Sequence, residues 1–196
     1  MPDEPEPLLE FREVMRRLRA ECPWKAEQTH RSLARYLLEE THETLEAIDT
    51  GDADHLREEL GDLLLQVYFH AAIAEETAAF TLDDVARGIT EKMHERNPHV
   101  FGDETGRQLT AAEVDARWQE IKLATKPRRD AVDGPPETLP ALLYAAKAVE
   151  RGLPVGEAQD DLGDRLLALV GEAVADGVDP EQALRDAVRR VLPADP

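Results

Sequence analysis

The sequence has one cysteine, few positive charges and no long apolar run, and each of these shortages argues against a class of protein. The single cysteine, Cys22, has no partner for a disulfide within the chain, which is typical of a reducing compartment. The formal net charge of −19 argues against a nucleic-acid surface, which is usually basic. The N-terminus is acidic and proline-rich, and no apolar run reaches the roughly 18 residues needed to span a membrane. We therefore expect a cytoplasmic protein that binds neither nucleic acid nor a membrane.

Hydrophobic residues make up 42% of the chain but aromatic residues only 5%, so the core is expected to consist mostly of Leu, Val and Ala. Apolar residues recur at intervals of three and four in residues 8–18, 33–48 and 56–71, which predicts three helices. Capping boxes at Thr81 and Thr110 predict two more helices, and Asp179 followed by Pro180 predicts another near the end. No stretch alternates with period two, so the predicted fold class is all-α.

A segment rich in proline, glycine and charge, residues 126–140, is predicted to be a linker. It separates a domain at residues 8–125 from a helical tail at residues 141–192. The tail partly repeats the domain, because ELGD at 59–62 recurs as DLGD at 161–164. No counterpart of the acidic segment at 39–43 precedes the second copy. The tail is interpreted as a truncated, degenerate second repeat, and chance similarity between two Leu-rich helices is the alternative.

Two short acidic motifs, EETHE at 39–43 and ELGD at 59–62, are the most informative part of the sequence. Positions three apart share a helix face, so Glu40 points with Glu43 and Glu59 points with Asp62. Two facing helices would bring these four carboxylates to one point, which is unfavourable unless cations lie among them. Oxygen ligands suit hard divalent cations, so the pattern predicts a Mg²⁺ site, with Mn²⁺ as an alternative.

The positions of the acids around each predicted helix favour a partly buried site. The apolar face of residues 33–48 is expected to centre near Leu37 and Ile48. The next helix is apolar on two sides, a main face of Leu60, Leu64 and Val67 and a nearly opposite side of Leu65 and Phe69. Glu59 and Asp62 fall between these sides, and the extra side predicts a second packing partner, either a helix or another subunit. Gly61 costs about 1 kcal/mol inside a helix and is interpreted as admitting a neighbouring helix or ligand.

Further motifs accompany the acidic ones in order: CPW at 22–24, EQT at 27–29, PHVF at 98–101 and WQEIK at 118–122. With these motifs, residues 8–150 resemble the MazG family of nucleoside triphosphate pyrophosphohydrolases. The resemblance implies an all-α, MazG-like helical bundle that depends on Mg²⁺ and forms homo-oligomers. It also implies hydrolysis of an NTP or dNTP to the monophosphate and pyrophosphate, as expected of an enzyme that clears nucleotide pools. The extra apolar side of residues 56–71 and the truncated second copy favour a dimer or a larger assembly.

The resemblance also assigns roles to individual residues. The implied metal ligands are Glu40, Glu43, Glu59 and Asp62, and Glu39 would orient or activate water. The implied substrate-binding residues are Lys92, Arg96, Trp118 and Tyr36, and the helix that carries Lys92 is expected to close the site. Such a set could neutralise phosphate charge and position water. Lys25 departs from the family pattern, which commonly has an acidic residue after CPW, so the role of that loop stays open.

Other interpretations remain open for parts of this pattern. Glu39/His42 and Glu91/His94 have the Glu-x-x-His spacing of a di-iron carboxylate bundle. However, His42 projects about 130° from the apolar centre of its helix and should face solvent. A non-catalytic helical module that binds nucleotide or metal is the second alternative. Acidic pairs on helices can also be solvated surface, the cations on residues 92 and 96 ordinary surface charge, and the tryptophan at 118 part of the core.

Overall fold

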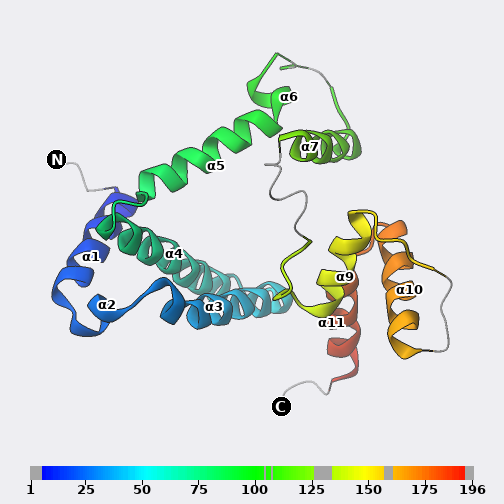
Figure 1. The fold of residues 1–196 in the computed structure, drawn as a ribbon, viewed down its shortest axis with the longest axis horizontal. Coiled ribbons are helices and arrows are strands. Elements are labelled where there is room, and N and C mark those ends of the chain that lie inside the picture. Colours follow the sequence, from blue (N-terminus) through cyan, green and yellow to red (C-terminus); the bar gives the residue numbers. More distant parts are fainter. Residues whose placement is uncertain (1–5, 104, 107, 126–133, 157–160, 193–196) are drawn as a thin grey trace. The chain divides into compact units, whose positions relative to one another are not determined.

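The computed structural model describes residues 6–103, 105–106, 108–125, 134–156 and 161–192, and these ranges hold helices and no strand. The prediction of an all-α fold is confirmed. The chain divides into two units, Met1–Trp118 and Gln119–Pro196, whose boundary lies inside a helix. The helices of the first unit are α1 (Pro7–Glu21), α2 (Pro23–Glu27), α3 (His30–Thr50), α4 (Ala53–Glu76), α5 (Leu82–Arg96) and α6 (Pro98–Phe101) (Figure 1). α7 (Ala111–Thr125) crosses the boundary, and α9 (Ala141–Glu150), α10 (Leu162–Ala175) and α11 (Pro180–Val191) follow.

The longest helices, α3 and α4, form an antiparallel hairpin that positions the acidic motifs (Figure 1). Thr29 caps the start of α3 by a reciprocal pair of hydrogen bonds with Ser32. Gly51 ends α3 with a φ of 72°, a left-handed conformation that glycine adopts without a steric penalty. Asp52 then caps α4 by accepting hydrogen bonds from two backbone N–H groups of its first turn. One glycine and one aspartate thus reverse the chain, which places α4 directly beside α3.

The core of the first unit lies where α1, α3 and α4 meet. Its buried members are Met15, Leu33, Tyr68, Phe69 and Ile73. Two of these five side chains are aromatic. Over the described chain as a whole, the buried hydrophobic residues are mostly Leu, Val and Ala, as expected: Leu33, Ala47, Ala71, Ala72, Ala74, Ala146 and Val170, besides Met15, Tyr68, Phe69 and Ile73. Few aromatic residues are present in the chain, but this junction concentrates them.

The burial of α4 departs from the predicted order of its apolar sides, although Leu64 of the predicted main face packs against the core. Phe69, on the side predicted to be secondary, is only 2% exposed, whereas Leu60 and Val67 of the predicted main face are 51% and 43% exposed. On α3, Leu37 and Ile48 are exposed as well, and Leu33 is buried instead. Periodicity locates apolar sides but does not say which of them the same chain will cover. Here the core that includes α1 covers the Phe69 side, and an apolar surface remains exposed along the hairpin.

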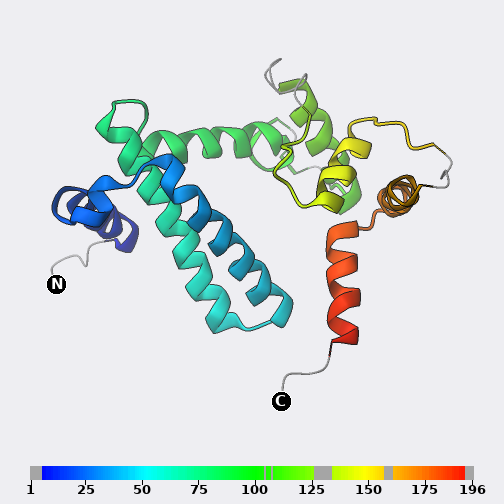
Figure 2. The ribbon, with the colours of Figure 1, turned by 60° about the horizontal axis from the view of Figure 1, so that its bottom comes forward.

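α5 leaves the hairpin at the end of α4 (Figures 1 and 2). The predicted capping box is present, because the Thr81 side chain accepts from the backbone N–H of Asp84 and the Asp84 carboxylate accepts from that of Thr81. Leu82 packs against the core, and α5 has no buried residue. In the described part of the chain, α5 packs against α4 and α6 and not against α3.

The second unit is a bundle of α9, α10 and α11, with Ala146 and Val170 buried in it. Asp179 caps α11 and is followed by Pro180 in the first turn, as predicted. Most of the predicted linker, residues 126–133, lies outside the described residues. None of the helices that the structure describes is long and apolar enough to cross a membrane.

The predicted second repeat uses its first acid differently from the first copy. Asp161, which matches Glu59, is the N-cap of α10, and its carboxylate accepts from the backbone N–H groups of Gly163 and Asp164. Glu59 instead lies inside α4. The Asp161 carboxylate thus caps a helix, whereas that of Glu59 does not. The interpretation of the tail as a truncated repeat stays a prediction.

Candidate functional site

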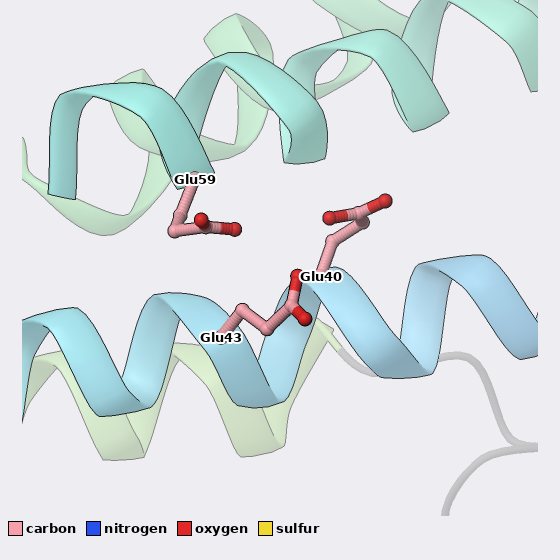
Figure 3. Close-up of side chains that lie close together, drawn as sticks. All are labelled: Glu40, Glu43 and Glu59. Carbon is pink, nitrogen blue, oxygen red and sulfur yellow. The ribbon is translucent and has the colours of Figure 1, made fainter. Parts of the chain in front are cut away.

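The α3–α4 hairpin brings three of the predicted metal ligands together. Glu40 and Glu43 project from α3 and Glu59 projects from α4 toward the space between the two helices (Figure 3). One carboxylate oxygen of each residue lies within 4.8 Å of the other two. Among the described residues this is a group of acids able to hold a metal ion, and it contains no histidine.

Glu59 is the most deeply buried member of this cluster, with 7% of its surface exposed. Its Oε1 lies 3.1 Å from Nε2 of His55, one helical turn earlier on α4. Its Oε2 is buried and accepts no hydrogen bond in the structure. A buried carboxylate oxygen without a donor is strongly unfavourable unless a cation compensates it. The acceptor is therefore suited to a hard divalent cation.

Asp62 and Glu39 act on the cluster through their charge. Burial is the main cause that raises the pKa of Glu40 above its usual value, and the charges of Asp62, Glu43, Glu59 and Glu39 raise it further, in that order. Asp62 is half-buried and Glu39 is exposed. Five carboxylates thus share one strongly negative region that a cation would stabilise.

The predicted cationic pair and the tryptophan lie together on other helices. Lys92 is exposed on α5, and Arg96 follows it one turn later. The Arg96 guanidinium lies 5.3 Å from the ring centre of Trp118 on α7, and Arg96 Nε is buried without a hydrogen bond. Because α5 does not pack against α3 in the described chain, its predicted closure over the acids stays a prediction.

Tyr36 lies one turn before Glu40 on α3, within a small aromatic patch. Its ring meets that of Trp24 edge to face at 6.1 Å, and its hydroxyl contacts the Arg35 guanidinium. Lys25 Nζ lies 5.5 Å from the ring centre of Trp24 and 5.1 Å from that of Phe69. The lysine that departs from the family pattern thus makes cation–π contacts in this loop.

Two expectations from the sequence fare differently in the structure. His42 is exposed, as expected, and His94 packs its ring against Phe101 at 4.5 Å, so neither histidine lies in the acidic cluster. At Gly61, an added Cβ would meet nothing within 4 Å. The prediction that Gly61 admits a neighbouring helix is therefore wrong for the described helices of this chain.

The sequence reasoning missed His55, which contacts Glu59. The available signal was the spacing of the two residues, because side chains four apart on a helix are neighbours. His55 stands outside both acidic motifs, and a lone histidine in a helix has no metal-site signature of its own.

Comparisons with known proteins identify relatives of this chain. Residues 28–101, which contain both acidic motifs, match the family described as the MazG nucleotide pyrophosphohydrolase domain. The chain is 40% identical over 189 residues to the nucleoside triphosphate pyrophosphohydrolase of Escherichia coli, covering 88% of this chain and 71% of that protein. It is 42% identical over 177 residues to the nucleoside triphosphate pyrophosphohydrolase of Mycobacterium tuberculosis, covering 89% of this chain but only 53% of that protein.

A similar solved structure is that of a mazG-related protein from Thermotoga maritima. The two chains match with a TM-score of 0.50 and 28% sequence identity, over 59% of this chain and 96% of the other. The similarity thus extends from the sequence to the helical fold.

Proposed function

The chain belongs to the MazG nucleotide pyrophosphohydrolase family, and we propose that it hydrolyses nucleoside triphosphates to monophosphates and pyrophosphate. The substrate class is NTP or dNTP, and the expected role is to clear nucleotide pools. The observation that carries the proposal is the buried, unpaired oxygen of Glu59 beside Glu40 and Glu43. Burying such a group is unfavourable in a protein without a cation, whereas a triphosphate-cleaving site needs one.

The acids of the hairpin fit a divalent cation. Glu40, Glu43, Glu59 and Asp62 would hold Mg²⁺, and Mn²⁺ would be accepted by the same oxygen ligands. The ion would neutralise charge on the phosphate oxygens and lower the pKa of a bound water. The raised pKa of Glu40 supports this assignment, because a cation would relieve the repulsion that causes part of it.

Glu39 is proposed to accept the proton of the attacking water. It is exposed, so water reaches it, and it directly precedes Glu40, where its charge helps to raise the pKa of Glu40. A water deprotonated in this position would add to phosphorus while the α–β linkage breaks and pyrophosphate leaves. Glu39 would then return the proton to solvent.

The cations needed against the triphosphate are proposed to come from α5. Lys92 and Arg96 lie one turn apart there, with Trp118 against Arg96 and Tyr36 in the aromatic patch near Glu40 as further substrate contacts. In the part of the chain that the structure describes, α5 and α3 do not pack together, so a second copy is the proposed source of the missing contact.

A homodimer is also supported by the apolar surface of the hairpin. Leu37 and Ile48 of α3 and Leu60 and Val67 of α4 are all exposed in the single chain. Several large apolar side chains exposed on two adjacent helices are typical of an interaction site. The molar mass in solution, measured by light scattering, tests this part: a monomeric wild type would exclude it.

The main experiment is pyrophosphate release from a panel of NTPs and dNTPs with Mg²⁺. Glu40→Gln and Asp62→Asn should each abolish turnover, as should EDTA with the wild type. Glu58→Gln is the matched control, since it removes an exposed carboxylate of α4 that is not in the cluster. A folded wild type that binds Mg²⁺ and nucleotide without releasing pyrophosphate would contradict the proposal and identify a binding module instead.

A further inference from the structure

We propose that His55 is a positioning residue for the metal site and holds the Glu59 carboxylate in the orientation that binds the cation. The proposal rests on the proposed function, because it takes Glu59 as a metal ligand. The contact is between Nε2 of His55 and Oε1 of Glu59, 3.1 Å apart. It leaves Oε2, which accepts no hydrogen bond, as the oxygen available to a cation.

The backbone of His55 is itself fixed by the cap of α4. Asp52 Oδ1 accepts from the backbone N–H of His55 at 3.1 Å and from that of Asp54 at 3.0 Å. His55 therefore lies in a first helical turn that is prevented from fraying. From this position its side chain reaches one turn along the helix, where Glu59 follows at four residues' distance. Asp52 thus fixes the backbone of His55, and the side chain of His55 in turn contacts Glu59.

Glu59 needs such a partner because its neighbours repel it. Glu40 and Glu43 place oxygens within 4.8 Å of it, and burial removes the water that would screen them. A glutamate side chain with rotatable bonds would turn away from that repulsion if nothing held it. Ligating carboxylates commonly depend on such outer partners, whose loss weakens metal binding about 10–100-fold.

His55 is also distinctive within the cluster. In the part of the chain that the structure describes, Glu59 has this basic contact, and Glu40, Glu43 and Asp62 have none. The imidazole can donate from Nε2 whether it is neutral or protonated, so the role does not depend on its charge. His55 thus distinguishes Glu59 from the other acids of the site, because it gives Glu59 alone a basic contact in the described chain.

The test is the affinity of the full chain for Mn²⁺, measured by titration with electron paramagnetic resonance. His55→Ala should weaken binding about 10–100-fold. His55→Gln should stay close to wild type, because a glutamine amide reaches about as far as Nε2. His42→Ala is the control, since it removes an exposed histidine of the same hairpin. In a Glu59→Gln background, His55→Ala should have no further effect, because the histidine acts through Glu59.

Helicity by circular dichroism accompanies each variant. If His55→Ala fails to fold, His55→Asn replaces it, because the shorter amide cannot reach Glu59 while the polarity is kept. Equal Mn²⁺ affinity of the Asn and Gln variants, or of His55→Ala and wild type, would overturn the role of His55. If the wild type still cleaves nucleotides, the proposed function survives that result. A wild type that neither binds Mn²⁺ nor releases pyrophosphate would overturn both.

Discussion

Replacing Glu40 by glutamine should stabilise the metal-free protein while it abolishes metal binding. The substitution keeps the shape of the side chain and removes one charge from the acidic cluster. At 4.8 Å, two unit charges repel by about 3.5 kcal/mol at an effective dielectric constant of ~20 and about 0.9 kcal/mol at ~80. Because Glu59 is buried, the repulsion between Glu40 and Glu59 lies nearer the upper figure. Because Glu43 is exposed, the repulsion between Glu40 and Glu43 lies nearer the lower one. We expect a gain of about 1–3 kcal/mol in the free energy of unfolding at low salt.

The pH dependence has a definite sign. The folded-state pKa of Glu40 is raised, so its unfavourable charge is absent below the unfolded pKa and complete above the folded one. The advantage of Glu40→Gln should therefore grow as the pH rises through that window, and should shrink with added salt.

Urea unfolding in EDTA measures this gain, with Glu58→Gln as the control that changes charge outside the cluster. The control should stay within about 0.5 kcal/mol of wild type. Added Mg²⁺ should then stabilise the wild type and not Glu40→Gln, since only the wild type keeps the ligand set. A Glu40→Gln protein that is less stable than wild type in EDTA would refute the repulsion on which this reasoning depends.

Three further predictions concern the frame of the site. Burial, and then the charge of His30 across a 2.7 Å Nδ1–Nδ1 contact, lower the pKa of His70. The contribution of neutral His70 to stability should thus be intact above about pH 6.5 and lost as the pH falls through the folded pKa. The free energy of unfolding from urea titrations should therefore depend less on pH over that range in His70→Gln than in the wild type. Phe69→Ala should lower the free energy of unfolding by about 3–5 kcal/mol, because Phe69 is 2% exposed; a loss below about 1 kcal/mol, which is typical of a surface substitution, would contradict this. Gly61→Ala should raise the melting temperature, with a gain of about 0.5–1 kcal/mol, because its Cβ meets nothing within 4 Å.

Features that depend on neighbours in the sequence could be predicted from it. The capping boxes at Thr81 and Thr110 are present, with Glu113 accepting from the Thr110 backbone at 2.8 Å, and Asp179 caps α11. The acids of the two motifs lie three apart on helices joined by a short turn at Gly51, which leaves few ways to arrange them. Local hydrogen bonding and helical spacing settle such features, so the sequence is sufficient for them.

Features that depend on distant parts of the chain could not be predicted in the same way. The helical periodicity of α4 places apolar residues on two sides of the helix. Phe69 is buried and Leu60 is exposed because α1 packs against the Phe69 side. His55 could not be identified from the sequence, because its proposed role depends on the burial of the Glu59 carboxylate in the folded chain. Where a choice between two faces is made by tertiary contact, the periodicity of one helix leaves it undecided.

The separation of acids from cations supports the proposal that a second copy takes part in the reaction. The acidic cluster lies on α3 and α4, whereas Lys92 and Arg96 lie on α5, which packs against α4 and α6 in the described chain. A triphosphate carries several negative charges, and a cation held by the acids neutralises only the oxygens it touches. The remaining charge needs basic side chains, and the chain as a whole has 23 of them against 42 acids. A second copy that covers the exposed apolar surface of the hairpin could bring its own α5 to the acids, so burial of that surface and completion of the site would be one event.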